Sequence, residues 1–477
     1  MKRAILLAAF LCGCHETRAT PPEDPLARQP ELPPLKTFDA PAPRIETLHN
    51  GLKVYLVERK GDGIEAIQFV ARSGASADPK DSPGLASLTA ALMETGAAGR
   101  SQTEIAAEAD SIGATLAVGA NQDTLFVAAS AMETNVKPMI DLLSAVVLRP
   151  NLAEAEWSRV RAQREAALVA QRAEPGVAAL RAFHAAAYGA NPLARPVEGT
   201  LASVKAMQLP DVKHFYQSIS PRDSALIAVG GAPAESVLAM LRMAFETWQP
   251  TPTQLPPAAS APVPQDRPRL TLADFPGKPQ SVLVVGQPAV PRSSPDYLAL
   301  QALNSILGGS FTSRLNQNLR EEHGYSYGAG SAFAFGRGPA PFTARSSVKT
   351  DVTGAALGEM LKEIERAVAE PLAPAELDKA RALLAYQLVE TLSHADALSR
   401  AVAQIFLYDL PADEFRTFVP RLQALAPSSV QAAARRTLEP AQMTIAIAGD
   451  KARVLPQLGP LHLPAPQLRD PAGDLLP

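Results

Sequence analysis

The same order of sequence features occurs twice in this chain, on either side of a proline-rich segment at residues 249–267. The two flanking bodies have roughly 200 residues each, and each begins with strand-like sequence, at residues 51–74 and 269–290. An apolar helix is predicted next in each body, at Leu85–Glu94 and at Tyr297–Leu307. A repeat of this length indicates the internal duplication of one α+β unit.

The later parts of the two bodies also correspond. Each continues with alternating, strand-like sequence and then a long helical stretch rich in Ala, Glu and Arg, at residues 153–186 and 373–405. Each ends in an apolar strand before glycine, "SALIAVGG" and "MTIAIAGD". Strand runs combined with amphipathic helices predict a sheet covered by helices. The predicted fold class is therefore α+β, with two duplicated domains that are each a mainly antiparallel sheet covered by helices.

Charge and composition exclude several classes of function. The net charge of the 477 residues is −3, which gives no sign of nucleic-acid binding. The two cysteines, Cys12 and Cys14, both stand near the N-terminus, so the body has neither a disulfide nor a cysteine-based zinc site. The closest histidines, His184 and His214, are thirty positions apart, which excludes a helical two-histidine metal motif.

The N-terminal sequence is typical of a secretory signal. "MKRAILLAAFLCGC" has a positive start, a short apolar run and a small-residue end, and it is too short to span a membrane. "LCGC" resembles a bacterial lipobox, which implies that Cys14 becomes the lipidated first residue. We therefore expect a periplasmic, membrane-anchored lipoprotein, and His15 rather than Asp after the cysteine favours the outer membrane. A plain secreted protein with an incidental cysteine is the alternative.

These features predict an order of six segments along the chain. They are a lipoprotein signal at 1–13, a lipidated Cys14 with a proline-rich tether at 14–44, a first domain at 45–248, a linker at 249–267, a second domain at 268–462 and a tail at 463–477.

Four stretches of the chain resemble insulinase/pitrilysin-type zinc peptidases, and most of all the branch that includes the mitochondrial processing peptidase. The stretches are "LHNGLKVYLVE", "GASADPKDSPGLASL", "NPLARPVEGTLASV" and "LGGSFTSRLNQNLREEHGYSYG", and the resemblance covers about residues 45–455. The resemblance implies that the two domains form half of a clamshell that encloses peptides.

Active members of that family carry His-x-x-Glu-His on the first-half helix. Residues four apart stand on one helix face, so both imidazoles can reach one zinc ion. Here the motif positions hold Ser87, Ala90 and Ala91. The resemblance places the later glutamate ligand near Ala170, with Glu165 as a nearby carboxylate that is better explained as a solvated helix charge. No metal site is expected in this chain.

The second half keeps a pair of residues that the family uses to hold substrate. Arg320 and Tyr327, seven positions apart, match this pair, and both side chains can donate hydrogen bonds to a substrate carbonyl. Tyr325 is a rival for the phenol. The alternative is that Arg320 is a surface ion pair and Tyr327 a packed strand aromatic.

The resemblance suggests a non-catalytic subunit, inactive alone, that supplies Arg320 and Tyr327 to a zinc-bearing insulinase-family partner for peptide hydrolysis. Its expected ligands are peptides or unfolded polypeptides, its zinc would be in the partner, and a lipid anchor would join it to a membrane. Two alternatives lack peptidase activity. One is a structural scaffold, and the other is a peptide-binding lipoprotein that adds a peptide to an exposed strand edge at Thr124–Ser130.

Overall fold

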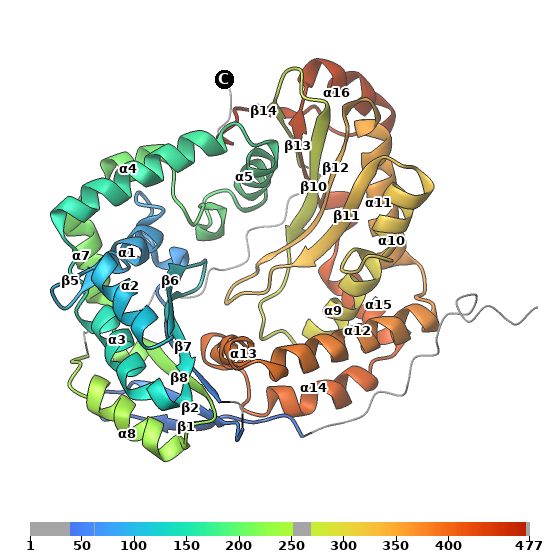
Figure 1. Ribbon diagram of the computed structural model, residues 1–477. Helices are drawn as coiled ribbons and strands as arrows, with labels where there is room; N and C mark the ends of the chain where they lie inside the picture. Colours follow the sequence, from blue (N-terminus) through green and yellow to red (C-terminus); the bar gives the residue numbers. More distant parts are fainter. Residues whose placement is uncertain (1–38, 62, 251–268, 474–477) are drawn as a thin grey trace, which may run out of the picture. The chain divides into compact units, whose positions relative to one another are not determined.

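Two six-stranded sheets, one in each half of the chain, form the framework of the computed structural model (Figure 1). The model describes residues 39–61, 63–250 and 269–473. The first sheet has the spatial order β1 (Arg44–Thr47), β2 (Lys53–Glu58), β8 (Ser224–Gly230), β3 (Ile64–Ala71), β7 (Leu125–Met132) and β6 (Thr115–Ala120). The predicted signal, the lipidated Cys14, most of the tether and most of the linker lie outside the described residues.

The second sheet repeats the first. Its spatial order is β14 (Gln467–Arg469), β9 (Arg269–Asp274), β13 (Thr444–Gly449), β10 (Gln280–Pro288), β12 (Pro341–Lys349) and β11 (Ser326–Phe333). In both sheets the first long strand of the half pairs in parallel with its last long strand, as β2 does with β8 and β9 with β13. In both, the next strand runs antiparallel between two neighbours, as β3 and β10 do. The predicted fold class is thus confirmed.

One predicted strand edge is wrong. Strand β7 pairs with β3 on one side and with β6 on the other, so Thr124–Ser130 offers no free edge for a peptide. The described edges of this sheet are β1 and β6. The sequence of β6, "TLAVGA", is rich in small residues and gives only a weak strand pattern, so its pairing partner looked unpaired.

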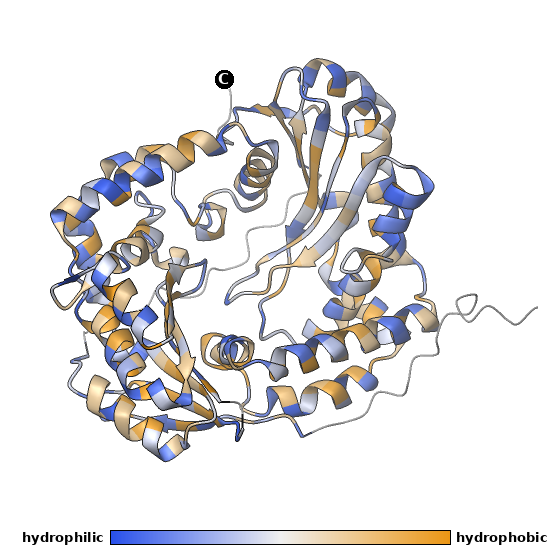
Figure 2. Cartoon of the chain, in the orientation of Figure 1, coloured by the Kyte–Doolittle hydropathy of each residue, from blue (hydrophilic) through white to orange (hydrophobic). Residues whose placement is uncertain are grey.

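The helices of each half follow the same order as the strands. In the first half they are α1 (Leu85–Met93), α2 (Gln102–Ser111), α3 (Val136–Leu148), α4 (Glu154–Gln171), α5 (Pro175–Tyr188), α6 (Leu201–Ala206), α7 (Leu209–Ser218) and α8 (Ala234–Phe245). In the second half they are α9 (Tyr297–Leu307), α10 (Arg314–Asn316), α11 (Thr353–Ala369), α12 (Pro374–Ser393), α13 (Ala395–Leu407), α14 (Glu414–Gln423), α15 (Pro427–Thr437) and α16 (Lys451–Leu458). Figure 2 shows most helices banded with hydrophobic and hydrophilic residues, as expected of helices that cover a sheet.

Each predicted long helical stretch is two helices. The first breaks before Pro175, which takes the first position of α5 because that position needs no backbone N–H donor. The second breaks at His394, between α12 and α13. No helix in the described parts of the chain is both long and apolar enough to cross a membrane.

Because of these breaks, one helix of each half can pack on the sheet of the other half. Helix α5 packs on β9, β10 and β13 of the second sheet, and α13 packs on β3 and β8 of the first. Phe183 of α5 is fully buried in a cluster with Phe275, Val284 and Ala446 of the second half. Phe406 of α13 lies edge-on to Tyr55 of the first sheet, with ring centroids 6.3 Å apart. Helices of both halves thus cover each sheet, which explains why β3, β8 and β13 are buried along nearly their whole length.

Polar contacts also hold the exchanged α13. The Arg72 guanidinium, at the end of β3, lies 4.5 Å from the centre of the Phe406 ring and 2.5 Å from a carboxylate oxygen of Asp409. Arg59 donates a 2.7 Å hydrogen bond to the carbonyl of Leu392, just before α13. The halves are therefore joined by packing and by charge-assisted bonds.

Removing the Phe183 ring should weaken the second half although Phe183 belongs to the first. We expect Phe183→Ala to lower the free energy of unfolding by about 3–5 kcal/mol, because it leaves a cavity under the second sheet. Denaturant unfolding measures the loss, and amide hydrogen exchange should speed up in Thr444–Gly449. The control is Val169→Ala on α4, an exposed site where the change should stay within about 0.5 kcal/mol. An unchanged rate of amide hydrogen exchange in that strand would contradict the packing of α5 on the second sheet.

Candidate functional site

Helix α1 is the element on which the zinc motif was sought, and its core side is intact. Leu85, Leu88, Leu92 and Met93 are buried, as their spacing predicts. The carboxylate of Asp78 fixes the start of the helix by accepting hydrogen bonds from the backbone N–H groups of Gly84 (2.7 Å) and Ala86 (2.8 Å). Burial raises the pKa of Asp78 to about 6, and the negative form suits the positive end of the helix.

A guanidinium lies against the first motif position. Nη1 of Arg164, on α4, donates a 2.8 Å hydrogen bond to Oγ of Ser87 and a 3.1 Å hydrogen bond to the carbonyl of Glu198. Burial lowers the pKa of this guanidinium. The other two motif positions are Ala90, which is buried, and Ala91, which is half-buried.

These residues do not fit a zinc ion. A hydroxyl that already accepts a hydrogen bond and two methyl groups offer no adequate ligand set. The Arg164 side chain has five donors and no acceptor, and its charge repels a divalent cation. No group of three or more His, Cys, Asp or Glu side chains placed to hold a metal occurs in residues 39–61, 63–250 and 269–473.

The predicted later ligand position on α4 lies outside the core that this helix shares with α1. Ala170, the predicted position of the later ligand, is exposed, whereas Val160 and Leu168 are buried in the same core as α1. Glu165 lies 3.8 Å from Arg161 in an ion pair on α4, in line with its interpretation as a helix charge. The sequence analysis did not single out Arg164, the residue of α4 that reaches the motif position.

A cavity of about 280 Å³ lies beside the altered motif. Its charged wall groups are two guanidiniums, of Arg159 and Arg164, and the carboxylate of Glu94. The wall thus carries two cationic groups and one carboxylate, which suits hydrogen bonding but not the binding of a divalent cation.

Arg320 lies on a single π-helical turn, η5 (Gln317–Glu322), which follows α10. Such turns are rare in proteins, and many of those that occur lie at functional sites. The Arg320 guanidinium stacks 4.4 Å from the centre of the exposed Phe311 ring, and its Nε lies 3.5 Å from a carboxylate oxygen of Glu321. The side chain is one-third exposed, so its remaining donors can reach a ligand.

Tyr327 lies in a bulge of β11, at the edge of the second sheet. The register of β11 with β12 shifts between Ser326 and Ala329, which leaves Tyr327 outside the regular pairing. Its side chain is 90% exposed, which excludes the alternative of a packed strand aromatic. Bulges at sheet edges often redirect a side chain toward a site.

Tyr325 is not free in the same way. Its ring stacks on His323 with centroids 4.9 Å apart, and it packs against the hydrophobic core of the second half. The geometry therefore favours Tyr327 as the available phenol.

Gly308, at the end of α9, allows a close approach of strand β11. Gly308 caps α9, and its carbonyl accepts a 3.1 Å hydrogen bond from the N–H of Ser331 in β11. A Cβ on Gly308 would lie 2.2 Å from that nitrogen, so no larger residue fits. Gly308 thus allows β11, which carries Tyr327, to lie against the end of α9.

Comparison with known proteins agrees with these observations. The model of the insulinase family, peptidase family M16, matches residues 54–201, and the model of the peptidase M16 inactive domain matches residues 206–384, together more than half of the chain. The chain belongs to the insulinase (M16) family.

Relatives in this family share part of the sequence. An uncharacterized zinc protease of Streptomyces coelicolor is 25% identical over 241 residues, which cover 50% of this chain and 52% of the relative. The mitochondrial-processing peptidase subunit beta of Lentinula edodes is 24% identical over 279 residues, which cover 56% of this chain and 58% of that protein. The matched region spans just over half the length of these relatives.

Solved structures share the fold. A peptidase M16 inactive domain from Pseudomonas fluorescens has a TM-score of 0.79 at 24% identity, covering 86% of this chain and 98% of the other. A chain of complex III2 from Candida albicans has a TM-score of 0.73 at 15% identity, covering 87% of this chain and 99% of the other.

The guanidinium at the M16 motif position predicts that histidines alone will not restore metal binding. We expect the double variant Ser87→His/Ala91→His to bind zinc at least about tenfold more weakly than the triple variant that also carries Arg164→Ala, because the Arg164 charge repels the ion. Titration calorimetry measures both affinities. The matched control adds Arg172→Ala, a change of an exposed arginine just after the end of α4, and should leave the weak binding unchanged. Equal zinc affinity with and without Arg164 would refute this role.

Proposed function

We propose that this chain is a non-catalytic subunit of a two-chain zinc metallopeptidase and that it supplies Arg320 and Tyr327 to a zinc-bearing insulinase-family partner. The observation that carries the proposal is an asymmetry between the two halves. The first half has an arginine against the former metal position, whereas the second half presents an arginine and a tyrosine whose polar groups are accessible.

The two side chains suit substrate binding. A guanidinium and a phenol can each donate to a peptide carbonyl, and donors aimed at the oxygen on which charge develops stabilise the transition state. Stacking on Phe311 restricts the Arg320 side chain, which reduces the entropy lost when it binds a peptide. The partner's zinc would supply the activated water, which this chain cannot provide.

Similarity to known subunits supports the same proposal. The Lentinula edodes relative is by name one subunit of a processing peptidase, and the Pseudomonas fluorescens structure is by name an inactive domain. By this analogy the substrates are peptides or unfolded polypeptides.

Arg320 provides the direct test. The purified chain alone should bind no stoichiometric zinc and cleave no peptide, and activity should appear on mixing with its zinc-bearing partner. In that complex Arg320→Ala should lower kcat/KM about 100-fold, since it removes a charged donor, and Tyr327→Phe about tenfold. Peptide cleavage at several substrate concentrations measures both.

Matched controls separate this role from assembly. Arg400→Ala and Tyr386→Phe change an exposed arginine and an exposed tyrosine of the same half and should leave cleavage unchanged. Analytical ultracentrifugation should show that Arg320→Ala still forms the complex. Full activity of Arg320→Ala in an intact complex would end the proposal.

We also propose that the chain is a periplasmic lipoprotein anchored to the outer membrane through Cys14. Membrane fractionation shows which membrane holds the protein. The support is the "LCGC" sequence and the proline-rich residues that follow it.

Cysteine variants test the anchor. We expect Cys14→Ser to abolish incorporation of a labelled fatty acid and to move the protein from the membrane fraction, because the acyl chains are then lost. The matched control Cys12→Ser, two residues earlier, should still be acylated. Acylation that persists in Cys14→Ser would contradict the anchor.

A structural scaffold is a second candidate, favoured by the likeness to a chain of complex III2. A scaffold would form a stable complex that shows no peptidase activity and that tolerates changes at Tyr327. The same cleavage and assembly measurements therefore distinguish the two candidates.

A further inference from the structure

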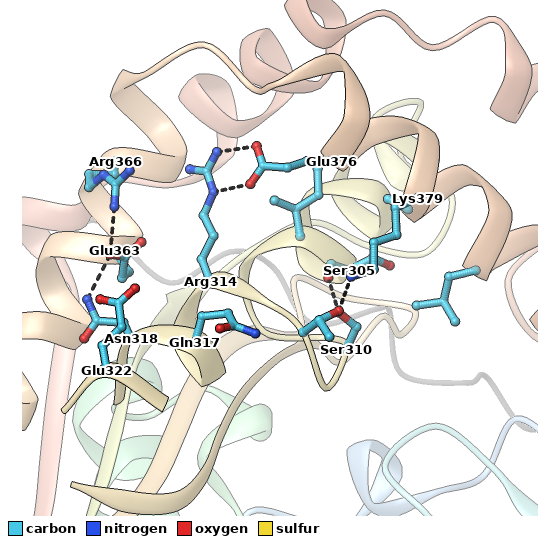
Figure 3. A pocket seen from close by; sticks show the side chains of 14 residues that line it. Ser305, Ser310, Arg314, Gln317, Asn318, Glu322, Glu363, Arg366, Glu376 and Lys379 are labelled. Carbon is cyan, nitrogen blue, oxygen red and sulfur yellow. Dashed lines mark hydrogen bonds and ion pairs between the residues drawn. The ribbon is translucent and has the colours of Figure 1, made fainter. Parts of the chain in front are cut away.

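A second polar cavity lies in the second half, separate from the exposed Arg320 and Tyr327 side chains. It has a volume of about 250 Å³ and is formed by the end of α9, by α10 and η5, and by α11 and α12 (Figure 3). Its wall carries three cationic side chains, of Arg314, Arg366 and Lys379, and three carboxylates, of Glu322, Glu363 and Glu376.

Acceptors gather on one side of this cavity. Oε1 of Glu363 accepts hydrogen bonds from Nδ2 of Asn318 (3.0 Å) and Nη1 of Arg366 (2.9 Å), while its Oε2 has no hydrogen-bond partner. Nδ2 of Asn318 also donates to Glu359 at 2.9 Å. Because both partners of Nδ2 are carboxylates, which only accept, the orientation of the amide is fixed and Oδ1 is left without a partner. Glu363 and Asn318 are only 3% and 6% exposed.

Donors lie elsewhere on the wall. Nε and Nη2 of Arg314 form a two-pronged ion pair with Glu376, at 2.8 and 2.7 Å, and the buried Nη1 has no partner. Lys379 contacts the hydroxyl of Thr312 and forms no ion pair with any described residue. Figure 3 shows Glu363, Asn318 and Glu322 on one side, Lys379 and the serine hydroxyls on the other, and Arg314 between them.

Unpaired buried polar atoms are unfavourable, so three of them on side chains that line one cavity call for hydrogen-bond partners. A partner for Glu363 Oε2 and Asn318 Oδ1 must donate, and a partner for Arg314 Nη1 must accept. The separation of the two kinds along one cavity matches a molecule with a positive and a negative end. A water molecule occupies about 30 Å³ in the liquid, so the cavity has room for a larger molecule.

We propose that this cavity binds a small zwitterion with an α-ammonium and a carboxylate group, as found in a free aliphatic amino acid or a dipeptide. The ammonium group donates to Glu363, Asn318 and Glu322, and the carboxylate accepts from Arg314 and Lys379. Ile306, Ala380 and Leu383 supply the apolar part of the wall for a short aliphatic side chain. The inference goes beyond the proposed subunit function, because it uses neither Arg320 nor a partner.

Titration calorimetry on the full chain tests the two charged ends separately. L-leucine should bind, whereas L-leucine methyl ester, which lacks the carboxylate, and N-acetyl-L-leucine, which lacks the ammonium, should each bind at least about tenfold more weakly. L-alanyl-L-alanine forms a further arm, and tighter binding than L-leucine assigns the site to dipeptides. No heat of binding for L-leucine or the dipeptide at millimolar concentration would mean that water alone fills the cavity, and would overturn the proposal.

Variants locate the binding. Lys379→Met removes an exposed charge from the rim without disturbing the fold, and should weaken L-leucine at least about fivefold while leaving the methyl ester unchanged. Glu363→Gln should weaken L-leucine and the methyl ester alike. The matched control is Lys205→Met, an exposed lysine of the first half, which should change neither. Binding that persists unchanged in Lys379→Met and Glu363→Gln would place the ligand elsewhere and refute the assignment.

Discussion

The reciprocal packing of α5 on the second sheet and α13 on the first is the interaction on which the rest of the structure depends. A mainly antiparallel sheet usually keeps one face for water, but here the central strands are buried along nearly their whole length. Helix α5 contributes to the burial of the second sheet through Phe183, and α13 contributes to the burial of the first through Phe406. Each half therefore completes the core of the other, and neither sheet is covered by its own helices alone.

In the first half, the residues at the motif positions differ from those of active relatives, while the helix that carries them keeps its packing. The apolar side of α1 is fully buried, and Asp78 still holds its start. On the other side, Arg164 fills the polar space and satisfies Ser87. A positive charge thus lies against the first position of the motif.

Much of the fold could be predicted from the sequence because the duplication supplies each element twice. Helix α9 has the predicted bounds, Tyr297–Leu307, since its apolar spacing is regular and a glycine follows it. The prediction that Thr124–Ser130 lies at a sheet edge was wrong. Its neighbour β6 consists mostly of small residues, which give only a weak strand pattern in the sequence. The packing of α5 and α13 on the sheet of the opposite half could not be predicted from the sequence. Hydrophobic periodicity shows which face of a helix is apolar but not which sheet that face covers.

The candidate site was predictable to a similar extent. Arg320 and Tyr327 were proposed from the resemblance of their surrounding sequence to the family, but the π-helical turn and the bulge that present them are local irregularities without a sequence signature of their own. The contact of Arg164 with Ser87 and the cavity lined by Arg314 and Glu376 were missed, because in each case the residues come from segments far apart in sequence. Only the folded chain brings such groups together.

The exchanged helices also bear on how such a chain could have arisen. A single ancestral half would leave one face of its sheet without a covering helix while its own helix pointed away. Two copies of that half could satisfy each other by swapping helices, as domain-swapped dimers do. Fusion of the two genes would then preserve the swap within one polypeptide and free each copy to diverge.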